Sequence, residues 1–105
     1  MAYYTVIETQ AFVKTSEHIW STDEHDEFIS WIANNPLAGD VIPGTSGLRK
    51  VRWSRSGSGT RGGTRVIYYN VLRNGHIWLI VVYTKSKFDN LPLKVLNRLK
   101  EEINE

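Results

Sequence analysis

The sequence predicts an α+β fold: an antiparallel or mixed β-sheet with an N-terminal helix or helical pair and a C-terminal helix. Helical apolar spacing occurs near both ends of the chain, within residues 16–34 and 90–103. Between them lie segments rich in β-branched and aromatic residues, separated by turn signals and not by helices. With 105 residues, 41% of them hydrophobic, the chain is expected to form one globular domain over 1–105.

The N-terminal part is expected to form a short strand and then helical structure. Residues 4–8 alternate well enough for a strand, and residues 16–20 fit one or two helical turns. A stronger helix begins at Ser21, because Ser21 and Glu24 have the spacing of a capping box. Acidic residues crowd its first turns, where the helix dipole is positive. Pro36 ends this helix, since the residue before a proline is disfavoured in helical conformation.

Three strands are expected in the middle of the chain, at 48–54, 64–72 and 77–83, after a loop at 37–47 rich in Gly and Pro. The Asn-Gly pair at 74–75 predicts a type I′ hairpin turn, in which both central residues need positive φ. The third segment is almost continuously apolar. That pattern predicts a central strand covered on both faces.

The last expected element is a C-terminal helix. Asn90 is a good N-cap, and Pro92 suits the first turn of a helix. Apolar residues follow at helical spacing, at Leu93, Leu96, Leu99 and Ile103.

Charge is strongly separated along the chain, although the net charge is only +2. Residues 1–40 hold one lysine and seven acidic residues, whereas residues 41–87 hold nine Lys and Arg and no Asp or Glu. So long an acid-free stretch predicts a positive face for an anionic partner, most often nucleic acid. A merely solvated basic surface is the alternative. Within this stretch, the Gly- and Ser-rich residues 55–63 suit a flexible basic hairpin loop against a phosphate backbone.

Several classes of function have no support in the sequence. The chain has no cysteine, which excludes disulfides, thiolate zinc sites and cysteine nucleophiles. Its histidines lack metal-ligand spacing, and neither a phosphate-binding G-x-x-x-x-G-K-[ST] loop nor a G-x-S-x-G elbow occurs. The longest apolar run, 77–83, is far shorter than a membrane span of roughly 20 residues, and the N-terminus lacks signal-peptide character. We therefore expect a soluble cytoplasmic protein without a metal, cofactor or membrane partner.

Basic side chains projected from the sheet are the remaining candidates for chemistry. A period of two places Lys50 and Arg52 on one face of their strand, and Arg65 on the same side of the next strand as Tyr69. Arginine binds phosphate in a bidentate manner, and a lysine among like charges can serve in proton transfer. Tyr68 or Tyr69 could stack on an unpaired base. Such a site could bind RNA, or could cleave it by activating the 2′-OH.

Two segments carry a resemblance to a known family. The runs G-D-V-I-P-G-T-x-G-L-R-K at 39–50 and R-G-G-x-R-V-I-Y-Y at 61–69 closely resemble the HigB-type branch of the RelE toxin superfamily. The resemblance implies a RelE-like fold and a toxin of a type II toxin–antitoxin system. Such toxins enter the A site of the 30S ribosomal subunit, cut translated mRNA without a metal and leave a 2′,3′-cyclic phosphate. It also implies a helix-turn-helix antitoxin of the HigA type.

The resemblance further implies roles for single residues. Lys50 and Arg52 match two basic strand positions that contact the phosphate and assist proton transfer, and Arg65 matches an arginine that stabilises transition-state charge. Lys85 falls in the basic stretch after the last strand. The tyrosine that RelE-type enzymes present beyond it has no clear counterpart, and Pro92 or its neighbours stand near that position. The implied catalytic residues are Lys50, Arg52, Arg65 and Lys85, and the expected RNA-binding residues are Arg49, Arg55, Arg61, Tyr68, Tyr69 and Lys87.

Two other classes of function stay open on the sequence. One is an RNA- or ribosome-binding module without catalysis, such as a decayed toxin. The other is an interaction protein whose basic stretch docks onto an acidic protein. Salt-sensitive binding to RNA would count against the second.

Overall fold

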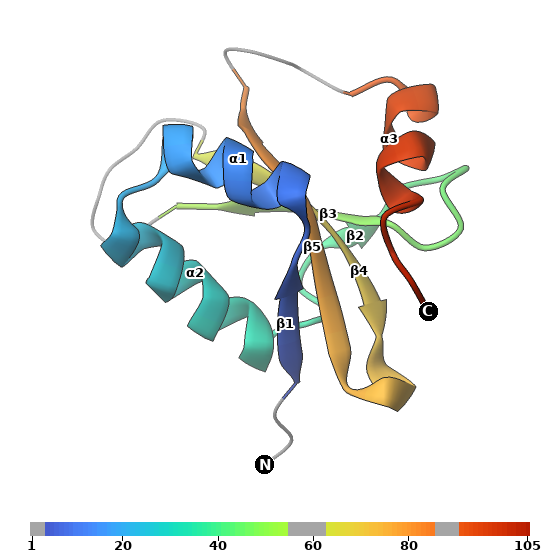
Figure 1. Cartoon of the computed structure of the whole chain (residues 1–105), viewed down its shortest axis with the longest axis horizontal. Helices are drawn as coiled ribbons and strands as arrows, with labels where there is room; N and C mark the ends of the chain where they lie inside the picture. The colour runs from blue at the N-terminus through green and yellow to red at the C-terminus, as the bar shows by residue number, and fades with distance from the viewer. Residues whose placement is uncertain (1–3, 55–62, 86–90) are drawn as a thin grey trace.

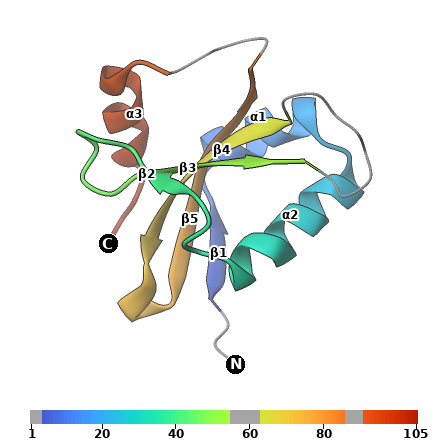
Figure 2. The ribbon, with the colours of Figure 1, turned by 180° about the vertical axis from the view of Figure 1, so that it is seen from behind.

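A mixed five-stranded sheet lies between a pair of helices and a third helix (Figure 1). The computed structural model describes residues 4–54, 63–85 and 91–105. Helices α1 and α2 cover one face of the sheet and α3 covers part of the other, as the view from behind also shows (Figure 2). The elements are β1 (Thr5–Glu8), α1 (Gln10–Ile19), α2 (Thr22–Asn34), β2 (Asp40–Val41), β3 (Arg49–Trp53), β4 (Thr64–Val71), the 3₁₀ helix η1 (Leu72–Asn74), β5 (His76–Thr84) and α3 (Leu93–Lys100).

The strand order across the sheet is β1-β5-β4-β3-β2. Strand β1 pairs with β5 in parallel, and the other neighbouring strands pair in antiparallel fashion. This arrangement confirms the predicted α+β class and mixed sheet. Strand β5 is buried along most of its length, as its apolar sequence predicted.

The N-terminal helices agree with the sequence in kind and differ in length. Helix α2 has the predicted capping box: Ser21 N–H donates to Glu24 Oε1 at 3.0 Å, and Glu24 N–H donates to Ser21 Oγ at 3.1 Å. Helix α1 is longer than the predicted turns at 16–20, because Thr9 caps it and its side chain accepts a hydrogen bond from Phe12 N–H.

Two local predictions in the strands were wrong. Residues 40–41, expected in a loop, form the short strand β2 against β3. The turn at 74–75 is not type I′: Leu72–Asn74 form a 3₁₀ turn, and Gly75, with φ 77°, ends it in left-handed conformation. Asn74 therefore does not need the positive φ that a type I′ turn requires.

Helix α3 begins later than expected. Its N-cap is Pro92, and its first residue is Leu93. The predicted N-cap, Asn90, lies outside the described residues.

A β-bulge shifts the register between β4 and β5. Ile67 pairs with Val81, but the next residue, Tyr68, pairs with Leu79, so Ile80 is the extra residue. Consecutive Ile80 and Val81 consequently both join the apolar cluster on the α3 face.

Two threonines next to β5 satisfy its backbone where β1 ends. Thr9 Oγ1 lies 2.9 Å from the carbonyl oxygen of Leu79 and 3.0 Å from that of Ile80, within donor reach of both. Thr15 Oγ1 accepts a hydrogen bond from the N–H of Val82 at 3.2 Å. The N-cap and the middle of α1 are thus bound to β5 by polar contacts.

The apolar core has two parts, one on each side of the sheet. Beneath α1 and α2, Trp53 meets Trp20 and Phe28 edge to face, at centroid distances of 5.3 and 5.4 Å. Beneath α3 lies a smaller cluster, made of Leu48, Ile67, Ile80, Val81, Tyr83 and Leu96. Among the described residues, no helix has the length and apolar character needed to cross a membrane.

Candidate functional site: a basic cluster on the α3 face

Three side chains form a row across the middle of the sheet. Arg52 on β3 lies opposite Arg65 on β4, and Arg65 lies opposite Tyr83 on β5. Directly opposite residues of antiparallel strands project from the same face, with Cβ atoms about 4.5–5.5 Å apart. The row therefore places the Cβ atoms of two arginines and one tyrosine side by side on one face of the sheet.

Lys50 belongs to the same face. It stands two residues before Arg52, and it lies opposite Ile67, which packs in the cluster beneath α3. We call Lys50, Arg52 and Arg65 the basic cluster. The strand pairing confirms the prediction that these three residues project from one face of the sheet.

The members of the basic cluster differ in burial. Arg65 is only 5% exposed, as is its neighbour Tyr83, whereas Arg52 is exposed and Lys50 is half-buried. A covered guanidinium has a restricted orientation and acts in a low dielectric, where its charge is felt more strongly. Arg65 is thus suited to stabilise charge at one place, and Arg52 is suited to reach a phosphate from the surface.

A cavity of about 280 Å³ adjoins the basic cluster, between the sheet and the N-terminal end of α3. Lys50 and Tyr83 supply its polar groups, and Leu91 and Leu93 belong to its aliphatic wall. A flat apolar group attached to an anion could lie there, with the anion toward the cations. The full lining is Ile42, Pro43, Lys50, Ile67, Tyr83, Leu91, Leu93 and Leu96.

The other predicted cations lie around or outside this region. Lys85 is exposed and directly follows the end of β5, two residues beyond Tyr83. Arg55, Arg61 and Lys87 lie outside the described residues.

Tyr68 and Arg49 have structural contacts on the opposite face. Tyr68 is fully buried; its hydroxyl donates to Pro36 O and accepts from Gly39 N–H, both at 2.8 Å. Arg49 lies opposite Tyr68 and donates to the carbonyl of Gly39 at 2.5 Å. Burial raises the pKa of Tyr68. The ring of Tyr68 has no exposed surface with which to stack on a base, whereas the half-buried Arg49 stays a predicted RNA-binding residue.

Tyr69 lies on the predicted side of β4 but far from the row. It is four residues from Arg65, which is about 13 Å along a strand. The Nζ atom of Lys100 lies 4.8 Å from the centroid of its ring. Tyr69 therefore packs against α3 and is too distant to exchange a proton with a phosphate held at Arg65.

Tyr83 is the residue of the row that the sequence reasoning missed. A two-residue turn at 74–75 would pair Arg73 with His76 and would thus place Thr84 opposite Arg65. The 3₁₀ turn and the bulge at Ile80 shift this register, and they bring Tyr83 to the position opposite Arg65. Tyr83 stands two residues after buried Val81, and this spacing would have placed both side chains on one face of the strand. The almost continuous apolar run concealed that alternation.

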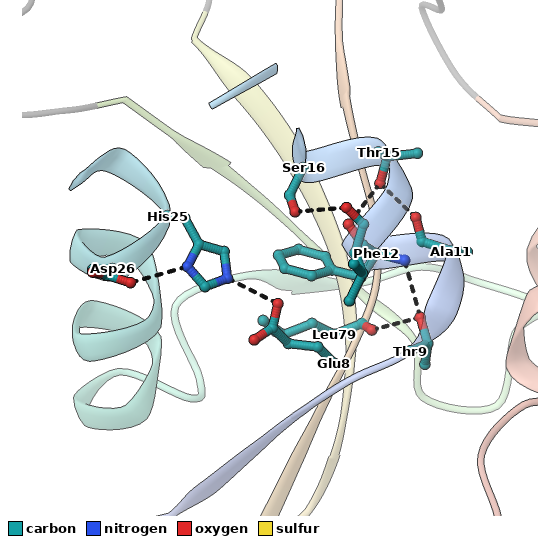
Figure 3. A network of polar contacts seen from close by, with 10 residues as sticks. Glu8, Thr9, Ala11, Phe12, Thr15, Ser16, His25, Asp26 and Leu79 are labelled. Carbon is teal, nitrogen blue, oxygen red and sulfur yellow. Dashed lines mark hydrogen bonds and ion pairs between the residues drawn. The ribbon is translucent and has the colours of Figure 1, made fainter. Parts of the chain in front are cut away.

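A second polar cluster lies on the side of the sheet that α1 and α2 cover (Figure 3). His25 Nε2 lies 2.8 Å from Glu8 Oε1, and His25 Nδ1 lies 3.1 Å from Asp26 Oδ1. Burial lowers the pKa of His25, but the hydrogen bonds and charges of Glu8 and Asp26 outweigh it and raise the pKa overall. Because both ring nitrogens face carboxylates, we interpret this contact as a link between β1 and α2.

Comparisons with known proteins give the fold. No family model matches the chain. A solved structure of a doubly substituted mutant of the E. coli toxin RelE, in the free state, matches with a TM-score of 0.59 and 16% sequence identity. The match covers 97% of this chain and 94% of that chain. A likeness at this identity concerns the backbone arrangement, so the chain has a RelE-like fold.

Proposed function

We propose that this protein is a toxin of a type II toxin–antitoxin system that cleaves translated mRNA in the ribosomal A site. The observation that carries the proposal is the row of Arg52, Arg65 and Tyr83, with Lys50 beside it, on one face of a RelE-like fold. The sequence resemblance to the HigB-type branch supports the same activity. It also supports a HigA-type helix-turn-helix antitoxin as partner. We place the protein in the cytoplasm, where it would encounter both the antitoxin and the ribosome.

The proposed reaction is a transfer within the RNA chain. The 2′ oxygen attacks the adjacent phosphorus, and the bond from phosphorus to the 5′ oxygen breaks, which leaves a 2′,3′-cyclic phosphate and a 5′-hydroxyl. One group must accept the proton of the 2′-OH, and another must donate a proton to the leaving oxygen. The step needs charge stabilisation on the phosphate but no oxidant or cofactor.

The basic cluster and Tyr83 can supply both the charge stabilisation and the proton transfers. Arg65 is covered and faces Tyr83, so it is assigned to the negative charge that develops on the phosphate. Arg52 is exposed and is assigned to binding the RNA backbone. Lys50 and Tyr83 both line the cavity and are assigned to proton transfer. Lys85, just beyond the end of β5, keeps the catalytic role that the resemblance implies. Arg55, Arg61 and Lys87, outside the described residues, are assigned to RNA binding around the site.

The test is cleavage of a defined mRNA on purified ribosomes, mapped by primer extension. We expect wild-type protein to cut within the translated region and Arg65→Ala to lose about 10²–10³-fold in rate. Arg73→Ala is the matched control, because Arg73 is an exposed arginine in η1. Circular dichroism of each variant checks the fold, and Arg65→Lys keeps the charge should Arg65→Ala fail to fold. Ribosome binding without any cut would contradict the proposal and favour a binding module without catalysis.

A further inference from the structure

The side chain of Glu105 lies against the hairpin that joins β4 and β5. Its Oε1 atom accepts from Asn74 Nδ2 at 2.7 Å, and its Oε2 atom accepts from Trp78 Nε1 at 2.5 Å. His76 Nδ1 lies 2.8 Å from the same Oε2 atom. Glu105 is an exposed residue as a whole, although only 16% of its side-chain surface is exposed. Three groups of one hairpin therefore converge on one carboxylate, although 27 to 31 residues separate them from it in sequence.

Helix α3 and the tail after it connect this contact to the basic cluster. In both views of the ribbon the tail runs from α3 toward the hairpin (Figures 1 and 2). Further polar contacts lie at the same end of the helix, where Lys100 Nζ donates to the carbonyls of Thr45 at 3.1 Å and Ser46 at 3.2 Å. The C-terminal end of α3 is thus bound to the sheet and to a neighbouring loop.

The N-terminal end of α3 is more open. Its N-cap, Pro92, makes no side-chain capping hydrogen bond, and Leu93 and Val95 are 48% and 41% exposed. Leu91 and Leu93 at this end form part of the wall of the cavity beside Lys50. A helix of eight residues is about 12 Å long, and buried Leu96 packs its middle onto the sheet, so the anchors at its C-terminal end contribute to where the wall at the other end lies.

We infer that Glu105 is a positioning residue: through Asn74, His76 and Trp78 it holds α3 beside Lys50 and Tyr83 and so places the wall of the cavity that these two residues line. Hydrogen bonds to a carboxylate are stronger than those between neutral groups, which makes one side chain an effective anchor. The contact itself does not depend on the proposed function, whereas its effect on RNA cleavage does.

The structural part is tested with Glu105→Gln and its matched control Glu102→Gln. Glu102 is an exposed carboxylate on the same tail, so both variants remove one negative charge from it. In isotope-labelled full-length protein, we expect Glu105→Gln to shift the indole N–H resonance of Trp78 and to speed hydrogen exchange of the α3 amides severalfold. Glu102→Gln should change neither. An unchanged Trp78 resonance, or unchanged exchange in α3, would overturn the inference.

A double-mutant cycle separates the contact from general effects of charge. Trp78→Phe removes the indole donor and keeps an aromatic ring. If the two side chains act together, Glu105→Gln should speed α3 exchange less in the Trp78→Phe background than in wild type. Equal effects in both backgrounds would show that Glu105 does not act through Trp78.

The functional part is tested by cleavage kinetics on ribosomes. Because the cavity wall would contact bound RNA, we expect Glu105→Gln to raise KM severalfold while kcat changes little, and Glu102→Gln to resemble wild type. If wild type cleaves and Glu105→Gln loosens α3 without raising KM, the link to the site is refuted. If wild type does not cleave at all, the proposed function fails, and the exchange experiment still tests the anchoring of α3.

Discussion

Arg65 on β4 lies directly opposite Tyr83 on β5, and both side chains are almost completely covered on the face that carries α3. The phenol can offer one phosphate group a hydrogen-bond donor, and the guanidinium beside it can offer the same group a positive charge. The pair depends on the bulge at Ile80, since pairing without it would bring a different residue of β5 opposite Arg65. The irregular point of the sheet therefore determines which side chain completes the row.

Replacing Tyr83 with Phe should reduce the rate of mRNA cleavage by about 10²-fold, because it removes one proton-transfer group. The fold should persist, since the ring remains. Tyr69→Phe is the matched control: it makes the same chemical change on the same face of the sheet, in β4 and away from the row. Primer extension over a time course measures both. A Tyr83→Phe variant as fast as wild type would exclude the hydroxyl from catalysis.

Removal of Arg52 should weaken the salt dependence of RNA binding. For every phosphate that the variant no longer neutralises, the slope of log K against log salt should fall by about 0.7 for single-stranded RNA. Fluorescence anisotropy with a labelled single-stranded oligonucleotide gives the slope for Arg52→Ala and for the control Arg73→Ala. Equal slopes for the two variants would argue against Arg52 as a phosphate ligand.

The Tyr68→Phe variant should lose stability and keep RNA binding. Its hydroxyl bridges Pro36 and Gly39 in a buried region, and loss of one partner there costs about 1–3 kcal/mol. Urea denaturation measures the free energy of unfolding, and anisotropy measures binding of RNA. A variant with normal stability and weakened RNA binding would return Tyr68 to the RNA site.

The contact of His25 with Glu8 should stabilise the protein more at acidic than at neutral pH. Since the folded-state pKa of His25 is raised above 6.5, its contribution is complete below the unfolded value and is lost as pH rises through the folded one. The side chains are partly exposed, so the expected contribution is at most about 1 kcal/mol. Denaturation of wild type and His25→Gln at about pH 5.5 and pH 8.5 tests this. His18→Gln, on exposed α1 surface, serves as control, and a pH-independent difference for His25→Gln would contradict the prediction.

The anchor at Glu105 should show the opposite dependence on pH. Hydrogen bonds from Asn74 and Trp78 lower the pKa of Glu105 from 4.5 to about 2. Its stabilising effect should therefore be complete above pH 4.5 and should disappear as pH falls through about 2. The stability difference between wild type and Glu105→Gln should shrink over this range, and Glu102→Gln provides the control. A difference that persists at the acid end would show that Glu105 stabilises the fold without its charge.

Local patterns predicted several features of this fold because neighbouring residues produce them. The capping box of Ser21 and Glu24 forms within one turn, and alternation along β3 suffices to place Lys50 and Arg52 together. The length of α1 could not be predicted in this way, because its cap, Thr9, also binds β5 about seventy residues away.

The same distinction applies to the candidate site. The side of β4 that carries Arg65 follows from its period of two, and it was predicted correctly. The burial of Tyr68 depends on the chain segment that folds over it, from Pro36 to Gly39, and the position of Tyr83 depends on the register of two strands. Both are long-range properties that no short stretch of the sequence contains.

The contacts of Thr9 and Thr15 with β5 have a consequence for the behaviour of the protein in concentrated solution. Strand β5 is the most apolar segment of the chain, and β1 pairs with it only as far as Leu79. Free backbone groups on such a strand would be a template for pairing with a second molecule and for aggregation. The two threonine side chains already bind the backbone of Ile80 and Val82, so this part of the strand is protected from intermolecular pairing.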